Sequence, residues 1–214
     1  MRQDLKLSEK LFCLSVNPTK GGIFFNASSN LNMTLVGLIL VELVNKGLIS
    51  IENEVVHLVN PALQNDEIYE FVLKPIRLRE KDRKIRTWIS WFDFWGRKIK
   101  KLIMHSLVKK YILRIEEKRF LFFPYDKVFL MDRDLVESIR QELESVWLGS
   151  AEPNEQSIIL AQMAAQNHLL ARIFPDRDKR KEAARRLKEF PQSPITKAVL
   201  QAIFIRNAGR AASH

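Results

Sequence analysis

The residues best suited to bind a ligand are the cations that follow a group of aromatic side chains near the middle of the chain. Trp88, Trp91 and Trp95 lie close together, and Gly96 is followed by the run Arg97-Lys98-Ile99-Lys100-Lys101. Guanidinium and ammonium groups donate charge-assisted hydrogen bonds to phosphate, and aromatic rings add apolar contact. The combination predicts a surface that meets a polyanion, either a membrane or a nucleic acid.

The positive charge of the chain is concentrated around this group. The 214 residues have a net charge of +10, while residues 74–119 hold sixteen Lys and Arg against five Asp and Glu. The remainder of the chain is therefore close to neutral. An acidic partner is expected at the basic segment rather than over the whole surface.

Catalytic chemistry finds little support in the sequence. The four histidines, His57, His105, His168 and His214, are scattered and lack the spacing of metal ligands. Cys13 has no nearby cation that would activate its thiol, and no glycine-rich loop suited to phosphate is present. We therefore expect neither an enzyme nor a bound metal or cofactor.

The chain is expected to be soluble, with any membrane contact peripheral. Its single cysteine excludes a disulfide within the chain and leaves the compartment open. The first ten residues include charged side chains, so no secretory signal is expected. The longest apolar run, residues 35–41, ends at Glu42 and is far shorter than the roughly 20 residues that span a bilayer.

The elements that position these residues are mostly helices. Apolar periodicity predicts helices over about 5–14, 33–46, 132–147, 155–174, 176–190 and 196–205. Asn32 and Gly47 are the expected start and stop of the second helix, which is apolar nearly all round and should be central. Residues 23–25 are predicted as a short strand or an extended segment, and residues 74–86 as a flexible basic loop.

Two hairpins are expected, each after a helix. β-Branched runs predict the first over residues 48–59, and the second runs from residue 112 to residue 124 with Glu116 and Glu117 in its turn. Residues 43–52 and 107–116 match in pattern, so the helix–hairpin element is repeated and resembles half of a winged helix. The predicted fold is mainly α: one compact helical domain over residues 1–205 with two small β-hairpins, followed by a C-terminal tail over 206–214.

The aromatic group also has a packing interpretation. Trp88, Trp91 or Phe92, Trp95 and Ile99 recur at helical spacing, which favours burial, while Phe94 lies off this stripe and is expected to be exposed. Of the neighbours Phe24 and Phe25, one should face outward.

Several segments, in their order and spacing, resemble the Golgi phosphoprotein 3 family, prokaryotic relatives included. They are residues 5–9, 37–43 with Lys46 and Gly47, 88–89, 107–110, 120–123, and the apolar helix after Glu152 and Pro153. The resemblance implies a mainly α-helical fold with a protruding hairpin used in self-association. It also implies a peripheral membrane protein that recognises phosphatidylinositol 4-phosphate and, in eukaryotic members, an adaptor for glycosyltransferase tails in the Golgi.

The resemblance also implies site residues. Two of the family's three basic headgroup ligands fall on Arg97 and Lys100, one helical turn apart, and the third falls on Val36. The family's tryptophan falls near Phe25, which would enter the membrane interface. General attraction to anionic lipid is expected to survive these substitutions better than selectivity for one phosphoinositide. The self-association hairpin would use Leu113, Ile115, Phe120 and Phe122.

Two alternatives remain open. A winged-helix protein that binds nucleic acid would use the cations of residues 96–111, although it is less favoured than the membrane protein. An adaptor for the basic tails of membrane enzymes would need an acidic surface. The sequence offers for it Asp132, Asp134, Glu137, Glu142 and Glu144.

Overall fold

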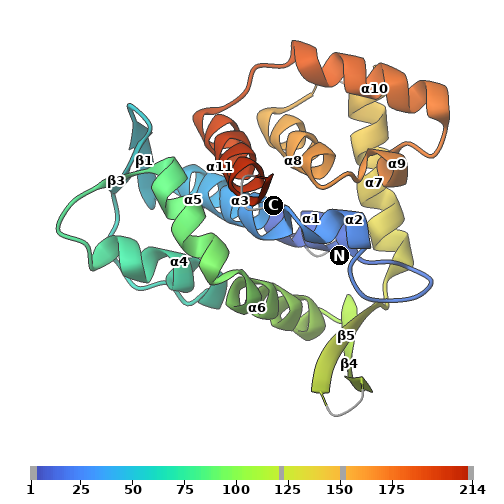
Figure 1. Cartoon of the computed structure of the whole chain (residues 1–214), viewed down its shortest axis with the longest axis horizontal. Helices are drawn as coiled ribbons and strands as arrows, with labels where there is room; N and C mark the ends of the chain where they lie inside the picture. Colours follow the sequence, from blue (N-terminus) through green and yellow to red (C-terminus); the bar gives the residue numbers. More distant parts are fainter. Residues whose placement is uncertain (1–3, 121–122, 150–152, 212–214) are drawn as a thin grey trace. The chain divides into compact units, whose positions relative to one another are not determined.

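The computed structural model describes residues 4–120, 123–149 and 153–211 and is mainly α-helical with two small antiparallel sheets (Figure 1). This confirms the predicted fold class. The contacts divide the chain into two compact units. Unit 1 is Met1–Leu31 with Ile103–Phe190, and unit 2 is Asn32–Leu102 with Pro191–His214.

Unit 1 packs helices around α1 (Leu7–Ser15). Both α7 (Arg133–Leu148) and α8 (Glu155–Gln166) contact α1, and α10 (Arg177–Glu189) contacts α7. The predicted charged helix over 176–190 is thereby confirmed, with Asp176 as its N-cap. The remaining elements are α2 (Phe25–Ser28), α9 (Leu170–Ile173), β4 (Leu113–Phe120) and β5 (Phe123–Leu130).

A buried carboxylate holds α1 in place within unit 1. Glu9 has no exposed side-chain surface, and it accepts hydrogen bonds from Ser106 Oγ at 2.6 Å and from Lys110 Nζ at 2.6 Å. The backbone N–H of Lys6 donates to the same carboxylate at 3.0 Å. A buried charge needs such partners to offset the loss of water. The interaction joins residues 5–9 to residues 107–110, two of the segments that resemble the family.

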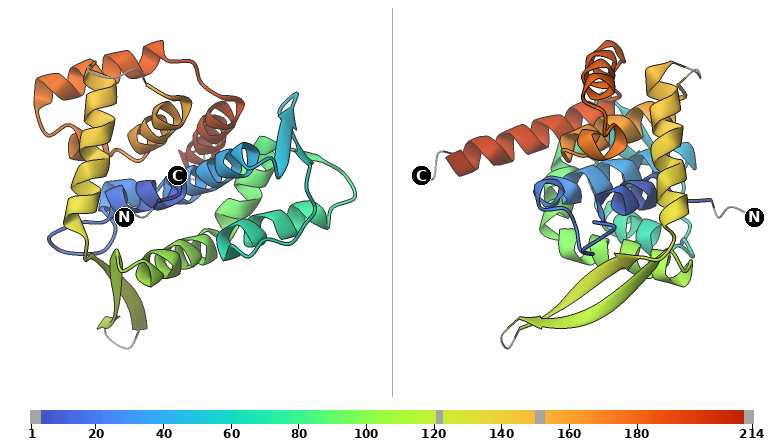
Figure 2. Two further views of the ribbon diagram at one scale, coloured as in Figure 1. Left: turned by 180° about the vertical axis from the view of Figure 1, so that it is seen from behind. Right: turned by 90° about the vertical axis from the view of Figure 1, so that its right-hand side faces the viewer.

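The hairpin of β4 and β5 is longer than the sequence predicts (Figure 2). Its register runs from Leu113 opposite Leu130 to Phe120 opposite Phe123. The prediction of a turn at Glu116 and Glu117 is wrong, since both lie inside β4 opposite Lys127 and Asp126. The outer part of this ribbon is largely solvent-exposed. Because strand residues that are exposed can be charged, the run of charged side chains over residues 116–119 resembles a turn in the sequence.

Two other predictions in unit 1 hold only in part. The helix expected over 155–174 is interrupted because His168 adopts a φ of 56°, and the chain resumes as α9. Of residues 23–25, expected as a short strand or an extended segment, Ile23 forms a single bridge with Val16, whereas Phe25 already begins α2.

Unit 2 contains the helix that the sequence predicts to be central. α3 (Leu31–Asn45) is buried from Met33 to Leu43, and Gly47 after it has a φ of 65°. Asn32, expected as the N-cap, lies instead in the first turn of the helix. The predicted hairpin is confirmed as β1 (Ile49–Glu52) and β2 (Val55–Leu58).

The expected basic loop over 74–86 is largely ordered into regular structure. α4 (Glu67–Arg77) includes its first residues, and Arg77 pairs with Glu70 at 2.9 Å. β3 (Arg83–Lys84) then adds a third strand opposite Val55 and Val56. This pairing is between backbones distant in sequence, so the basic side chains gave no sign of it.

The last elements of unit 2 hold the basic and aromatic residues. α5 (Ile85–Phe94) packs against α11 (Pro194–Ala211), as Figure 1 shows. α6 (Gly96–Lys109) follows α5 after one residue, and the boundary between the units falls within it. α11 extends beyond the predicted 196–205, through residues expected to form the C-terminal tail.

Candidate anion-binding corner of α5 and α6

The aromatic group is anchored by burial of its first members. Trp88 and Phe92 are buried, with their ring centroids 5.8 Å apart, and Ile99 of α6 is buried as well. The predicted packing stripe is therefore confirmed for these three residues. Trp95 departs from it, since 42% of its surface is exposed, and Phe94 is 85% exposed, as its place off the stripe predicts.

The chain turns sharply between these residues and the cations. The N–H of Trp95 donates to Phe92 O at 2.9 Å, and Trp95 O accepts from the N–H of Lys98 at 2.9 Å. Gly96 lies against the side chain of Asn32, where a Cβ would overlap it. A glycine is therefore required here by close approach rather than by an unusual φ. We call this turn and residues 93–101 around it the α5–α6 corner.

Arg97 and Lys100 lie one turn apart on α6. Arg97 is exposed and Lys100 is half-buried. Burial, and secondly the charge of Arg97, lower the pKa of Lys100, whereas the charge of Asp93 acts in the opposite direction. In the described part of the chain neither cation has a carboxylate within ion-pair distance. The corner thus holds two like charges close together, and Asp93 acts on Lys100 only from beyond ion-pair distance.

Asp93 forms an ion pair with Arg206, a residue that the sequence pattern alone does not mark as part of a site. Its Oδ2 lies 3.8 Å from Arg206 Nη1, so the pair links the end of α5 to α11. Arg206 follows Val199, Ala202 and Ile203 at helical spacing on the buried face of α11. The periodicity of these residues predicts that this face of α11 is buried, but it does not predict that the face packs against α5.

The other residues implied by the family resemblance have different settings. Val36 has no exposed surface within α3 and contributes no polar group. Phe25 belongs to unit 1 and is 95% exposed, while Phe24 is half-buried, so Phe25 is the outward-facing member of the pair. Arg97 and Lys100 belong to unit 2.

The hairpin residues differ in their accessibility. Leu113 is buried at the base of β4 and Ile115 is half-buried. The side chain of Phe120 and the whole of Phe122 lie outside the described residues. Self-association through this hairpin stays a prediction.

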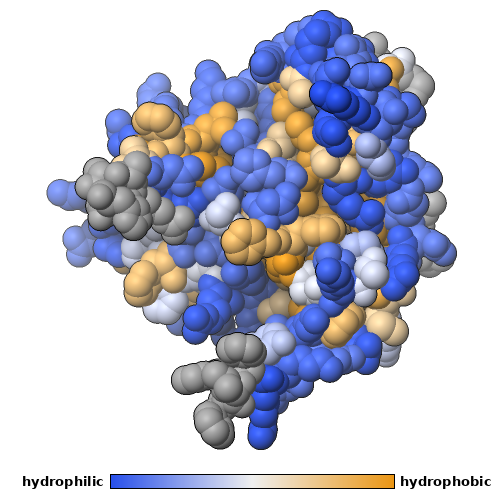
Figure 3. All heavy atoms as spheres, turned by 45° about the vertical axis from the view of Figure 1, so that its right-hand side comes forward, coloured by the Kyte–Doolittle hydropathy of each residue, from blue (hydrophilic) through white to orange (hydrophobic). Residues whose placement is uncertain are grey.

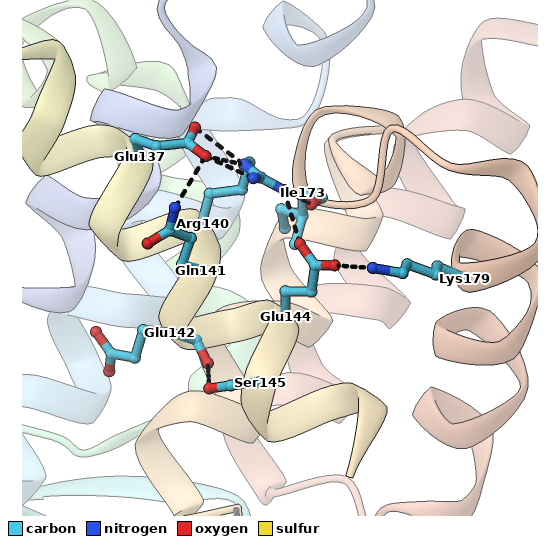
Figure 4. A network of polar contacts seen from close by, with 8 residues as sticks. All are labelled: Glu137, Arg140, Gln141, Glu142, Glu144, Ser145, Ile173 and Lys179. Atoms are coloured by element: carbon cyan, nitrogen blue, oxygen red, sulfur yellow. Dashed lines mark hydrogen bonds and ion pairs between the residues drawn. The ribbon is translucent and has the colours of Figure 1, made fainter. Parts of the chain in front are cut away.

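Most of the acidic residues expected to form a surface for basic tails already have partners within unit 1 (Figure 4), whereas Asp134 is exposed. Glu137 and Glu144 both pair with Arg140, Lys179 lies 2.8 Å from Glu144, and Asp132 caps the helix. Glu142 lies 3.3 Å from Lys10. The hydrogen bond from Arg140 lowers the pKa of Glu137, and that from Lys179 lowers the pKa of Glu144. A basic peptide would have to displace these cations.

Three further observations concern metal binding, nucleophilic chemistry and membrane-spanning helices. Over the described ranges, no three His, Cys, Asp or Glu side chains lie close enough together to hold a metal ion. Burial raises the pKa of the Cys13 thiol, which opposes a nucleophilic role. No helix within those ranges is long and apolar enough to cross a membrane.

These observations describe a mainly α-helical protein whose α5–α6 corner exposes basic and aromatic side chains. The sequence model of the Golgi phosphoprotein 3 (GPP34) family matches residues 7–205, nearly the whole chain, and the chain belongs to this family. The family is not one of enzymes. No curated protein sequence matches the chain significantly.

Proposed function

We propose that the protein is a peripheral membrane protein that binds anionic phospholipid headgroups at the α5–α6 corner. The observation that supports this proposal is the pair Arg97 and Lys100, one of them half-buried and neither within ion-pair distance of a carboxylate among the described residues, in a chain of this family. A phosphoinositide monophosphate, such as phosphatidylinositol 4-phosphate, is the preferred ligand in membranes that contain it.

The chemistry of a phosphate monoester fits this pair. Such a group bears between one and two negative charges near neutral pH and can accept a hydrogen bond from each cation. Its binding would offset both the repulsion between Arg97 and Lys100 and the partial loss of water around Lys100. Each exposed cation nearby, such as Lys98 or Lys101, would add ~1 kcal/mol at an anionic membrane surface.

Nucleic acid is the second candidate ligand, because α6 also presents exposed cations to a phosphate backbone. The burial of α3 leaves α6 as the only one of the two hairpin-preceding helices with exposed basic residues. Binding to nucleic acid would weaken steeply with salt. A gel shift at low salt that is lost on removing Lys98 and Lys101 would support this ligand over a membrane.

Family membership supports two further parts of the proposal. In a eukaryotic cell the protein would associate with the Golgi from the cytoplasmic side. It would act there as an adaptor for the tails of membrane enzymes, and a homo-oligomer would increase its attachment by multivalency. Pull-down with such tails tests this role separately from lipid binding.

The experiment that tests the proposal compares two cation pairs in the full chain. Arg97→Ala/Lys100→Ala removes the corner pair. Lys84→Ala/Arg86→Ala removes an equal charge from exposed positions at the start of α5. Co-sedimentation with vesicles that contain phosphatidylinositol 4-phosphate should show roughly a tenfold loss of affinity for the first double variant, since about 1.4 kcal/mol is one factor of ten. The second should lose much less, and equal losses would contradict a site at the corner.

A further inference from the structure

The structure assigns a second role to the α5–α6 corner: we infer that Phe94 and Trp95 enter the apolar boundary of an anionic bilayer while the neighbouring cations contact its headgroups. This inference rests on the proposed function, because it concerns the same membrane. It adds an apolar anchor within unit 2 to the electrostatic contact.

The first observation is the exposure of these aromatic side chains. Phe94 is 85% exposed and Trp95 42% exposed, whereas Trp88 and Trp147 are buried. Apolar side chains also reach the surface elsewhere between hydrophilic ones (Figure 3), so a single exposed ring proves nothing. Phe94 and Trp95 differ from such isolated side chains because they are two adjacent rings in contact with each other at the α5–α6 corner.

The second observation is how the rings are held. Phe94 meets Trp95 edge to face at 5.6 Å, Trp95 lies 6.1 Å from Trp91, and Trp91 lies 4.8 Å from Phe92. The exposed rings are thus the end of a continuous series of aromatic contacts that begins at the buried Phe92. Because Gly96 is fixed against Asn32, this end is held at a set position before any partner binds.

The third observation is the charge around the rings. Arg97, Lys98 and Lys101 are exposed next to them, and the sequence of α6 contains no Asp or Glu. Phe and Trp beside Lys and Arg are the residues that lie at the boundary between headgroups and acyl chains. A second copy of the chain docked here through the same face would bring like charges together, so we assign the surface to an anionic bilayer.

The test uses the intrinsic fluorescence of the full chain. Trp95 is the most exposed tryptophan, so vesicles of phosphatidylcholine and phosphatidylserine with brominated acyl chains should quench its emission on binding. Trp95→Phe keeps an aromatic ring and should lose most of the quenching. Phe94→Ser should bind these vesicles about tenfold more weakly. Its control, Phe204→Ser, removes a ring that is 72% exposed on α11, two residues before Arg206 and so turned away from α5. It should change binding less than twofold.

Each other outcome contradicts the inference. Binding that depends on Arg97 and Lys100 but shows no quenching would leave the proposed function standing and remove the apolar anchor. No binding to any anionic vesicle would remove both. Equal losses for Phe94→Ser and Phe204→Ser would show a general effect of surface hydrophobicity. A smaller oligomer for Phe94→Ser in sedimentation would assign the rings to a second copy of the chain.

Discussion

Gly96 lies against the side chain of Asn32 with no room for a methyl group between them. Asn32 is in the first turn of α3 and Gly96 is the first residue of α6. The contact therefore constrains the start of α6, the helix that carries Arg97 and Lys100. The position of the candidate site therefore depends on an uncharged contact as well as on its cations.

Substitution of Gly96 should therefore disturb the corner. Gly96→Ala should lower the free energy of unfolding by ~1–3 kcal/mol, the usual range for overpacking, and should weaken vesicle binding. Gly209→Ala is the matched control, because Gly209 is also helical and nothing surrounds its missing Cβ within 4 Å. It should raise stability by up to ~1 kcal/mol. Urea unfolding that moves in the same direction for both variants would contradict this assignment.

The buried carboxylate of unit 1 is expected to be a major source of its stability. Glu9→Ala should destabilise the protein by ~3 kcal/mol, because it leaves the Lys110 ammonium without its partner. Glu142→Ala removes a pair with Lys10 in which half of the glutamate is exposed, and should cost less than ~1 kcal/mol. Chemical denaturation of both variants measures the difference, and similar costs would show that burial of Glu9 is not decisive.

The half-buried cation of the corner should oppose folding. The pKa of Lys100 is lower in the folded chain than its ordinary value of 10.5, so the unfolded chain binds more protons as pH approaches that value. The cost is complete below the folded pKa and is relieved as pH rises through it. Lys100→Met should therefore raise the free energy of unfolding by roughly 0.5 kcal/mol at neutral pH.

The pH dependence gives the control for this prediction. The advantage of Lys100→Met over the parent should shrink as pH rises toward 10.5, because the parent then loses its unfavourable charge. Lys98→Met, at an exposed position on the same helix, should show no such trend. A Lys100→Met variant that is less stable than the parent at neutral pH would show that the ammonium stabilises the fold.

The exposed aromatic ring of unit 1 should contribute to binding without contributing to stability. Phe25→Ser should leave the free energy of unfolding within ~0.5 kcal/mol of the parent, since 95% of Phe25 is exposed. Vesicle affinity should fall roughly fivefold, about 1 kcal/mol, if the ring is partly removed from water on binding. Tyr111→Ser removes a ring of 85% exposure from the same unit and should have a smaller effect. Equal losses of vesicle affinity for the two variants would contradict a specific role of Phe25 at the membrane interface.

The sequence predicts the local features of this fold well. Periodicity locates α3 and α7, with Gly47 after the end of the first and Asp132 as the cap of the second. Asn53 and Glu54, both at positive φ, form the tight turn expected between β1 and β2. It fails where a distant backbone decides the conformation. The pairing of Arg83 with Val56 and the break at His168 leave no trace in side-chain pattern.

The candidate site shows the same division. The helical spacing of Arg97 and Lys100 and the exposure of Phe94 follow from local periodicity. The partial burial of Lys100 and the approach of Arg206 to Asp93 do not, because they depend on how helices distant in sequence pack together. This partial burial distinguishes Lys100 from the exposed cations Arg97, Lys98 and Lys101.

The measurement that tests the central claim most directly is the binding of the full chain to three kinds of vesicle at one ionic strength. The vesicles contain phosphatidylcholine alone, phosphatidylcholine with phosphatidylserine, or phosphatidylcholine with phosphatidylinositol 4-phosphate, the last two matched in charge. We expect no binding to the first, binding to the second and tighter binding to the third, with the attraction weakened by salt. Equal binding to all three, or binding to none, would contradict a headgroup site at the α5–α6 corner.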